Sequence, residues 1–181
     1  MKLTAWPART TNRLSRIGLD LGQFGARAVQ LRQRRGVYSL ANLASVHFES
    51  STSPEALAAQ QTEFVRGLTN GSSFSGRSVC VSLSLPDVEF HAIDIPELVL
   101  QQSGGQSSQA IRFELERLTT LNDQSFEFGY WALPPVRTLG ANLMAAMTPT
   151  PKVLSTVSLC SDGGLECDCV DATPAALGRF L

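Results

Sequence analysis

The chain has 181 residues, a hydrophobic content of 43% and a formal net charge of −1 at pH 7. This length predicts one domain, or one domain with a subdomain, and the apolar content is enough for a buried core. The near-zero charge argues against a nucleic-acid-binding protein, because such proteins need a basic field to displace counterions. No apolar run in the sequence is long enough to span a bilayer.

The first residues of the chain are basic. Residues 1–16 contain Lys2, Arg9, Arg13 and Arg16 and no acidic residue, and they lack the apolar core of a signal peptide. We predict a flexible basic tail over residues 1–15, with a targeting sequence or a membrane-surface contact as the alternatives.

The stretch from Arg16 to Leu31 has a strand–turn–strand pattern. Aliphatic residues at positions 17, 19 and 21 alternate with two glycines and Asp20, which predicts a β-strand with one nearly bare face. The residues from Gln23 to Gly25 predict a tight turn, and a second strand follows with Arg27 near its start.

The aspartate and the turn of this hairpin also suggest a phosphate site. Amides of a turn that follows a strand can point at phosphate oxygens, and a carboxylate such as Asp20 can hold the water shell of a magnesium ion. An ordinary hairpin in which Asp20 only caps the turn explains the same residues, so the motif alone leaves both alternatives open.

The rest of the chain alternates between predicted strands and helices, and we expect a mixed sheet with residues 86–147 as a small inserted subdomain. Strands are expected over residues 38–48, with the even-numbered apolar residues on one face, and over 79–85, 88–95, 126–133, 139–147 and from 165. Helices are expected from Ser53 to Asn70, from Ser107 or Ser108 to Leu121, from Pro149 to Cys160 before the turn Asp162-Gly163-Gly164, and from Thr173.

The polar residues suggest no catalytic constellation. No histidine base is placed near Ser82 or Ser84, and Glu114 and Glu116 fall on different sides of a predicted helix. On the same helix Arg112 stands four residues before Glu116, a spacing at which the two can pair on the surface. We therefore assign no catalytic residue.

The chain has four cysteines, Cys80, Cys160, Cys167 and Cys169. A zinc site would need a second close pair or nearby histidines, and the two histidines are isolated in the sequence. We predict reduced, mostly buried thiols and no metal site, which fits a reducing cytoplasm.

Several segments resemble the type IV pilus assembly protein PilM family, actin-like cytoplasmic proteins related to the division protein FtsA. The residues that carry the resemblance are Ile17 to Gly22 with Ala28 to Leu31, Val79 to Pro86, Ala110 to Arg117, and Gly164 to Ala172. They follow the order of the N-terminal half of that family. The resemblance implies an α/β (α+β) fold with an actin-like, ribonuclease H-like mixed sheet. Residues 16–85 and 148–181 would form the first-lobe subdomain, and residues 86–147 the inserted strand-helix-strand-strand subdomain.

The resemblance also implies a nucleotide site, of which this chain would hold a weak half. Its residues would be Asp20, Gly22, Gln23, Phe24 and Arg27. Family members carry small hydroxyl residues after the Asp-x-Gly and a lysine at the position of Arg27, and their second lobe starts where this chain ends. We expect no firmly bound cofactor, and ATP with magnesium only where a second lobe is supplied. An actin-like ATPase completed by another chain is the enzymatic alternative.

By the same resemblance, the chain would be a cytoplasmic scaffold at the inner-membrane face that binds the cytoplasmic tail of a bitopic, PilN-type inner-membrane protein. The tail would lie in a groove between lobe and insert, lined by Val81, Leu83, Ile111, Arg112, Leu115 and Glu116. Core packing explains the apolar members of this set equally well. The cytoplasmic domain of a type II secretion L component is the alternative, and a homo-oligomer is left open. The chain would associate with the membrane only through its partner, and we expect no nucleic-acid partner.

Overall fold

The computed structural model describes residues 13–48, 53–71, 73–100, 105–119, 125–134 and 140–178. The chain divides into two compact units, Met1–Ser82 with Val157–Asp171 (the first unit) and Leu83–Thr156 with Ala172–Leu181 (the second unit). From the sequence we predict that the inserted subdomain begins after residue 85 and ends at residue 147. Residues 172–181 are predicted to belong to the first lobe. The divisions fall inside elements instead, because β4 (Ser78–Leu83) and α4 (Thr150–Asp162) each continue from one unit into the other.

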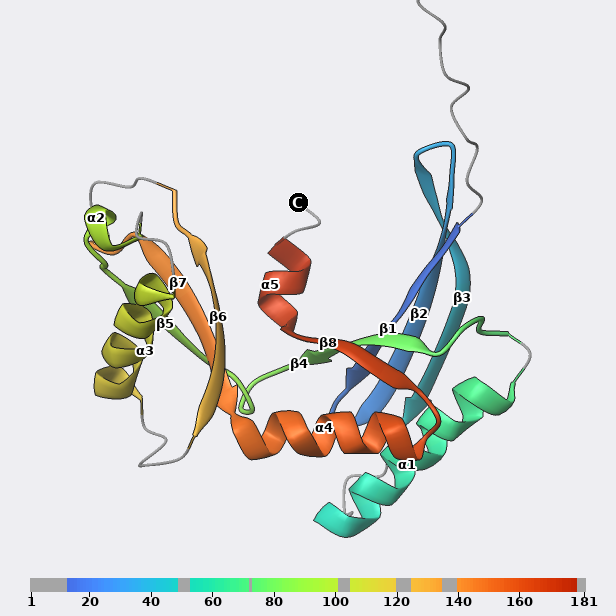
Figure 1. The fold of residues 1–181 in the computed structure, drawn as a ribbon. Coiled ribbons are helices and arrows are strands. Elements are labelled where there is room, and N and C mark those ends of the chain that lie inside the picture. The colour runs from blue at the N-terminus through green and yellow to red at the C-terminus, as the bar shows by residue number, and fades with distance from the viewer. Residues whose placement is uncertain are drawn as a thin grey trace, which may run out of the picture. The chain divides into compact units, whose positions relative to one another are not determined.

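The first unit is built on a five-stranded sheet in the order β3-β2-β1-β4-β8. β1 (Arg13–Leu21), β2 (Gly25–Arg34) and β3 (Val37–His47) pair antiparallel, whereas β1 and β4 pair parallel. β8 (Glu166–Ala172) forms the other edge (Figure 1). This mixed sheet confirms the predicted fold class.

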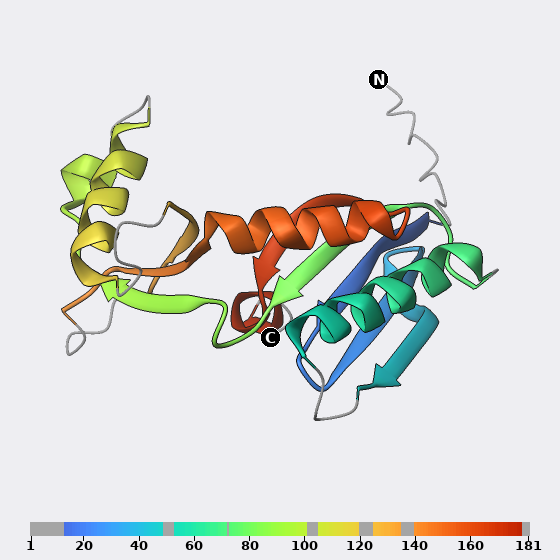
Figure 2. The ribbon, with the colours of Figure 1, turned by 90° about the horizontal axis from the view of Figure 1, so that it is seen from below.

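Helices cover one face of this sheet. α1 (Pro54–Asn70) begins as the sequence predicts, because Ser53 Oγ accepts a hydrogen bond from the Ala56 amide at 3.3 Å, and it ends before Gly71. Figure 2 shows α1 and the end of α4 along the sheet, and the core lies beneath them. Its buried members are Ile17, Leu19, Ala28, Val65, Leu68, Val79, Val81, Cys160 and Leu165.

The end of α4 lies in tight contact with α1. A Cβ atom added at Gly163 would stand 2.2 Å from Cγ1 of Val65, so only a glycine fits there. The next residue, Gly164, has φ +83°, which is the left-handed conformation that glycine adopts most easily after a helix. The predicted Asp162-Gly163-Gly164 turn is therefore fixed both by packing and by backbone conformation.

A buried glutamine joins the opening strands to the loop before β4. The Nε2 group of Gln30 donates to the carbonyl oxygens of Ser15 at 3.0 Å and Ser75 at 2.7 Å. Its Oε1 atom accepts from Asn42 Nδ2 at 3.2 Å and from the Ser75 amide at 3.0 Å. Gln30 is 1% exposed, and this network satisfies its amide group within the protein.

β1 begins earlier than the sequence predicts. Arg13 pairs with Gln33, and Ser15 Oγ accepts a hydrogen bond from the Leu31 amide at 2.9 Å. Residues 13–15 therefore belong to the sheet and not to the predicted tail, whose residues 1–12 lie outside the described part. β1 is longer than predicted because residues 13 and 14 pair through their backbone with the end of β2. The sequence has no apolar alternation there that would predict a strand.

β3 contains an irregularity that the sequence does not predict. Successive residues of β2 pair with Asn42 and then with Leu40, so Ala41 is an extra residue in β3. The prediction of one apolar face along this strand is therefore wrong. Tyr38 and Leu40, before the bulge, lie on the opposite face of the sheet from Ala44 and Val46, which follow it.

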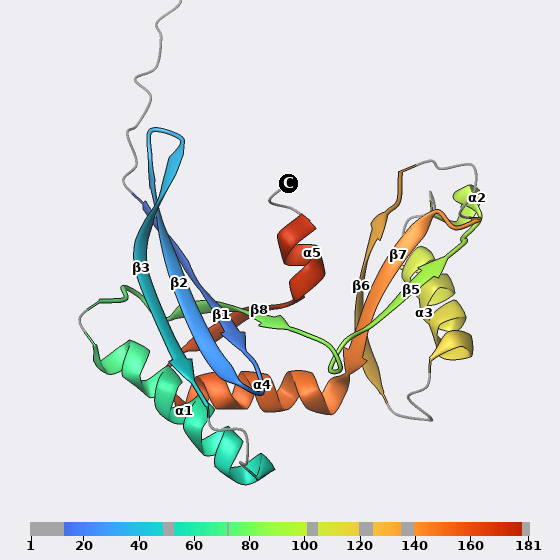
Figure 3. The same cartoon turned by 180° about the vertical axis from the view of Figure 1, so that it is seen from behind.

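The second unit contains a three-stranded antiparallel sheet in the order β5-β7-β6. The strands are β5 (Glu89–Ile93), β6 (Phe126–Ala132) and β7 (Leu143–Pro149), and α3 (Gln106–Leu118) covers one face of them (Figure 3). The buried core between helix and sheet comprises Ile93, Ile95, Ile111, Leu115, Phe126, Leu143, Ala145 and Met147. The order of these elements agrees with the predicted strand-helix-strand-strand insert.

Helix boundaries in the second unit differ in detail from the prediction. Gly105, with φ 85°, precedes α3 and no side chain caps it, so neither Ser107 nor Ser108 is the cap. The short helix α2 (Glu97–Leu100) was not predicted, because four residues are too few to show a helical period. α5 (Thr173–Gly178) begins at the predicted residue. Among the described residues, no helix has the length and apolar character needed to cross a membrane.

All four cysteines are free and lie in the first unit. Cys160 is buried, and the other three are half-buried. Burial raises the pKa of the Cys160 thiol to about 12 and that of the Cys80 thiol to about 11. Both thiols are therefore protonated and weakly nucleophilic at neutral pH. In the described ranges, no three His, Cys, Asp or Glu side chains are grouped so as to hold a metal ion.

Candidate functional site

Asp20 is the last but one residue of β1, beside the turn of the opening hairpin, as the sequence predicts. Arg27 Nη1 lies 4.0 Å from Asp20 Oδ2, and Ser82 Oγ lies 3.5 Å from Asp20 Oδ1. The Arg27 side chain is 74% exposed and that of Asp20 37% exposed. The carboxylate therefore has a cation and a hydroxyl beside it within the first unit.

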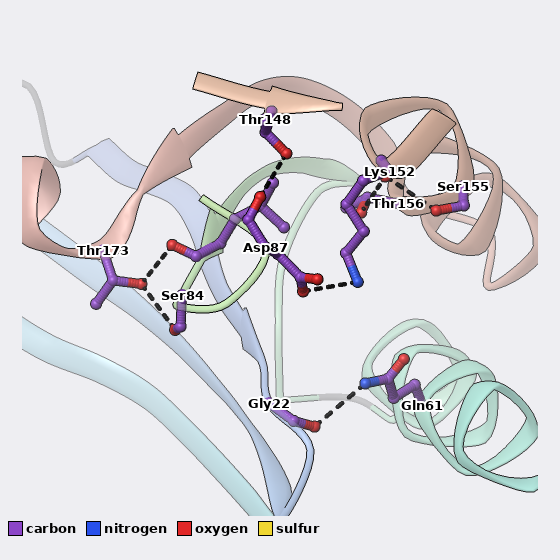
Figure 4. Close-up of polar contacts among 10 residues, drawn as sticks. Gly22, Gln61, Ser84, Asp87, Thr148, Lys152, Ser155, Thr156 and Thr173 are labelled. Carbon is purple, nitrogen blue, oxygen red and sulfur yellow. Dashed lines mark hydrogen bonds and ion pairs between the residues drawn. The ribbon is translucent and has the colours of Figure 1, made fainter. Parts of the chain in front are cut away.

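The turn between β1 and β2 is held by contacts within the first unit. The Gly22 amide donates to the Gly25 carbonyl oxygen at 2.9 Å, and Gln61 Nε2 on α1 donates to the Gly22 carbonyl oxygen at 3.2 Å (Figure 4). The Phe24 carbonyl oxygen accepts from the Phe48 amide at 2.9 Å. A Cβ atom at Gly25 would lie 2.4 Å from a β3 carbonyl oxygen, so the turn requires glycine there.

These contacts bear on the predicted half-site for a nucleotide. The Gly22 amide, which the phosphate hypothesis needs, is already bonded inside the turn, and Arg27 takes the place of a cation beside Asp20. Gln23 and Phe24 are exposed at the tip, where small residues would give a phosphate room. The hairpin residues thus fit a phosphate–magnesium group poorly.

The apolar residues predicted to line a partner groove are buried. Val81 is in the core of the first unit, and Ile111 and Leu115 are in the core of the second, each 0% exposed. Leu83 is 4% exposed. All four side chains are buried and offer almost no surface to a ligand, so recognition by this predicted set would depend on its polar members.

Arg112 has structural contacts that the sequence did not predict. Its guanidinium carbon lies 4.8 Å from the ring centre of Phe126 and 5.1 Å from that of Phe128, and its Nη1 donates to the Phe126 carbonyl oxygen at 3.3 Å. No ion pair joins Arg112 to Glu116, both of which lie in the described part. The predicted pairing is therefore wrong, because the aromatic residues of β6 hold the guanidinium instead.

A turn after β4 is ordered by polar contacts within the second unit (Figure 4). Lys152 Nζ lies 2.8 Å from Asp87 Oδ2, and Thr148 Oγ1 donates to the Asp87 carbonyl oxygen at 2.7 Å. Thr173 Oγ1 lies 3.2 Å from Ser84 Oγ. No sequence pattern predicts this cluster, because its members are far apart in the chain and each is an ordinary polar residue.

No protein-family model matches this sequence, and no curated protein matches it. Solved structures match its fold. A chain of the PilM-PilN type IV pilus biogenesis complex is 20% identical, with a TM-score of 0.73, and the match covers 91% of this chain and 49% of that chain. The cytoplasmic domain of EpsL, an inner membrane component of the type II secretion system of Vibrio cholerae, is 13% identical, with a TM-score of 0.55. That match covers 86% of this chain and 56% of that chain.

This chain thus spans about half the length of the two solved chains and has their fold over that length. The likeness confirms the fold that the sequence resemblance predicts.

Proposed function

We propose that this chain is a scaffold of type IV pilus assembly that works on the cytoplasmic side of the inner membrane and binds the cytoplasmic tail of a PilN-type membrane protein. The supporting observation is the extent of the fold match, which covers 91% of the chain and therefore includes parts of both units. The matched structure is a complex of PilM with PilN, which makes a PilN-type tail the first partner to test.

A scaffold role in a type II secretion system is the second candidate. The match to the cytoplasmic domain of EpsL favours it, although that match has the lower TM-score. The two roles differ in their partner, so binding of a PilN-type tail would decide for the pilus role.

The polar residues of α3 are the best probes of tail binding. Glu116 is exposed, whereas Arg112 is half-buried against β6. We expect that Arg112→Glu weakens binding of a synthetic PilN-type tail peptide by about tenfold, or about 1.4 kcal/mol, if the peptide carries an acidic group to this cation. Fluorescence anisotropy of a labelled peptide measures this affinity.

Two further variants separate recognition from stability. Arg112→Glu also removes the contacts with Phe126 and Phe128, so its thermal unfolding is measured beside its affinity. Glu116→Lys changes an exposed charge on the same helix, and Glu63→Lys changes an exposed charge on α1 as the matched control. If the folded Arg112→Glu and Glu116→Lys proteins both hold the peptide as tightly as the control does, the tail binds elsewhere or not at all.

We also expect no measurable ATP hydrolysis by this chain alone. Stabilising the transition state of phosphoryl transfer requires groups on several sides of the developing charge, and one hairpin provides only one side. Isothermal titration calorimetry with ATP and magnesium, together with a phosphate-release assay, tests this. Micromolar binding that Asp20→Asn abolishes would contradict it and would favour the ATPase alternative.

A further inference from the structure

β3 differs from the other edge strands of the molecule. The two described sheets have four edges, formed by β3, β8, β5 and β6. Acidic residues interrupt three of them: Glu166, Asp168 and Asp171 in β8, Glu89 in β5, and Glu127 in β6. β3 has eleven residues and contains no Asp, Glu, Lys, Arg or Pro. Charges and prolines are the usual means by which proteins prevent edge strands from pairing with other chains, so this edge is unprotected.

The same strand exposes large apolar side chains. Val37 is 68% exposed, Leu43 65% and Leu40 59%, and Tyr38 and Val46 are also exposed. These residues lie on both faces of the strand, and exposed apolar side chains along an open strand edge favour an interaction surface over a solvated one.

We propose that β3 pairs antiparallel with β3 of a second copy of this chain, joining two five-stranded sheets about a two-fold axis. A pairing of this kind is isologous, so the strand must be complementary to itself. The extra residue Ala41 restricts the possible registers. Leu40 and Leu43 pair with β2 residues that are two apart, so they lie on the same face of the sheet although three positions separate them.

Of the registers that keep matching faces together, the proposal takes the one that places like residues opposite one another. Leu40 of each copy lies opposite Leu43 of the other on one face, and Val37 lies opposite Val46 on the other face. Directly opposed apolar pairs of this kind stabilise antiparallel strands. The bulge lies at the two-fold axis, where it interrupts neither arm of the ladder.

Electrostatics also favours a second copy as the occupant. Identical strands bring identical charges together, which normally opposes self-pairing, and β3 contains no Asp, Glu, Lys or Arg that would do so. The net charge of −1 adds little repulsion between two copies of the chain. The proposal concerns the chain alone and does not depend on the proposed tail-binding function.

Sedimentation equilibrium over a range of concentrations tests the proposal. We expect a mass approaching twice that of one chain for the natural sequence, and the mass of one chain for Leu40→Lys combined with Leu43→Lys, which places lysines opposite lysines. Leu40→Lys combined with Leu43→Glu is expected to regain the double mass, because this register sets opposite charges against each other. Leu98→Lys, at a 79% exposed position on α2, is the control and should retain the double mass.

Three results would overturn the proposal. The first is the mass of one chain for the natural sequence at every concentration. That result would mean that β3 does not pair with a second copy, and a strand of a different protein would then be the candidate partner. The second is a double mass that persists in the doubly lysine-substituted chain. The third is the mass of one chain for the Leu40→Lys, Leu43→Glu variant, although its circular dichroism spectrum matches that of the natural chain.

Discussion

Replacing Gly163 with alanine is expected to lower the free energy of unfolding by about 3 kcal/mol, because the added methyl group overlaps a core side chain. Its carbon would lie 2.2 Å from Cγ1 and 2.8 Å from Cβ of Val65. Val65 is fully buried on α1, so relief requires α1 and the end of α4 to separate and the core to open. Urea denaturation followed by circular dichroism measures the loss.

Gly67→Ala is the matched control for this substitution. Gly67 is inside α1, two residues after Val65, and an added Cβ atom there would meet nothing within 4 Å. This substitution is expected to stabilise the protein by about 1 kcal/mol through helix propensity. Adding Val65→Ala to Gly163→Ala should recover part of the loss, so the two substitutions together should cost less than their sum. A Gly163→Ala protein as stable as the natural chain would show that α1 and the end of α4 can move apart at little cost in free energy.

Replacing Gln30 with methionine is expected to lower the free energy of unfolding by about 3 kcal/mol, because it keeps the volume but removes every hydrogen bond of the amide. The Ser75 amide and Asn42 Nδ2 would lose their acceptor, and the carbonyl oxygens of Ser15 and Ser75 would lose a donor. Burial of such unpaired groups costs more than the hydrogen bonds themselves contribute. Urea denaturation gives the total, and amide hydrogen exchange should show lost protection at Ser75.

Gln33→Met on the same strand is the control for this substitution. Gln33 Nε2 donates to the Tyr38 hydroxyl group at the surface at 3.0 Å, and the loss of an exposed hydrogen bond should change stability by less than about 0.5 kcal/mol. Equal effects of the two substitutions would mean that water reaches Gln30 and replaces its partners.

The parts of the fold that sequence analysis predicted are those with local signals. Ser53 before Pro54 predicts the start of α1, and the alternation from Ile17 to Leu21 predicts β1. The turn Asp162-Gly163-Gly164 predicts the end of α4. Each signal acts through the backbone of neighbouring residues, so a short window of sequence contains it.

The parts that sequence analysis missed depend on residues far apart in the chain. The bulge at Ala41 is set by pairing with β2, and the side chain of Gln30 contacts Ser75, which is 45 residues away in the sequence. The hairpin with Asp20 was located correctly because its motif is contiguous. The cluster of Lys152 with Asp87, and the aromatic rings beneath Arg112, join separate elements and leave no periodic trace.

The first unit is built from two segments of the chain that are separated by Leu83–Thr156, and this has a consequence for its folding during synthesis. Its strands β1 to β4 leave the ribosome early, but Cys160 and Leu165, which belong to its core, follow only after the whole of Leu83–Thr156 has been made. At the usual rate of about 5–20 residues per second, the early strands therefore wait for several seconds with part of their apolar face uncovered. Exposed apolar surface of this kind favours aggregation, and it is covered only when the end of α4 and β8 complete the core.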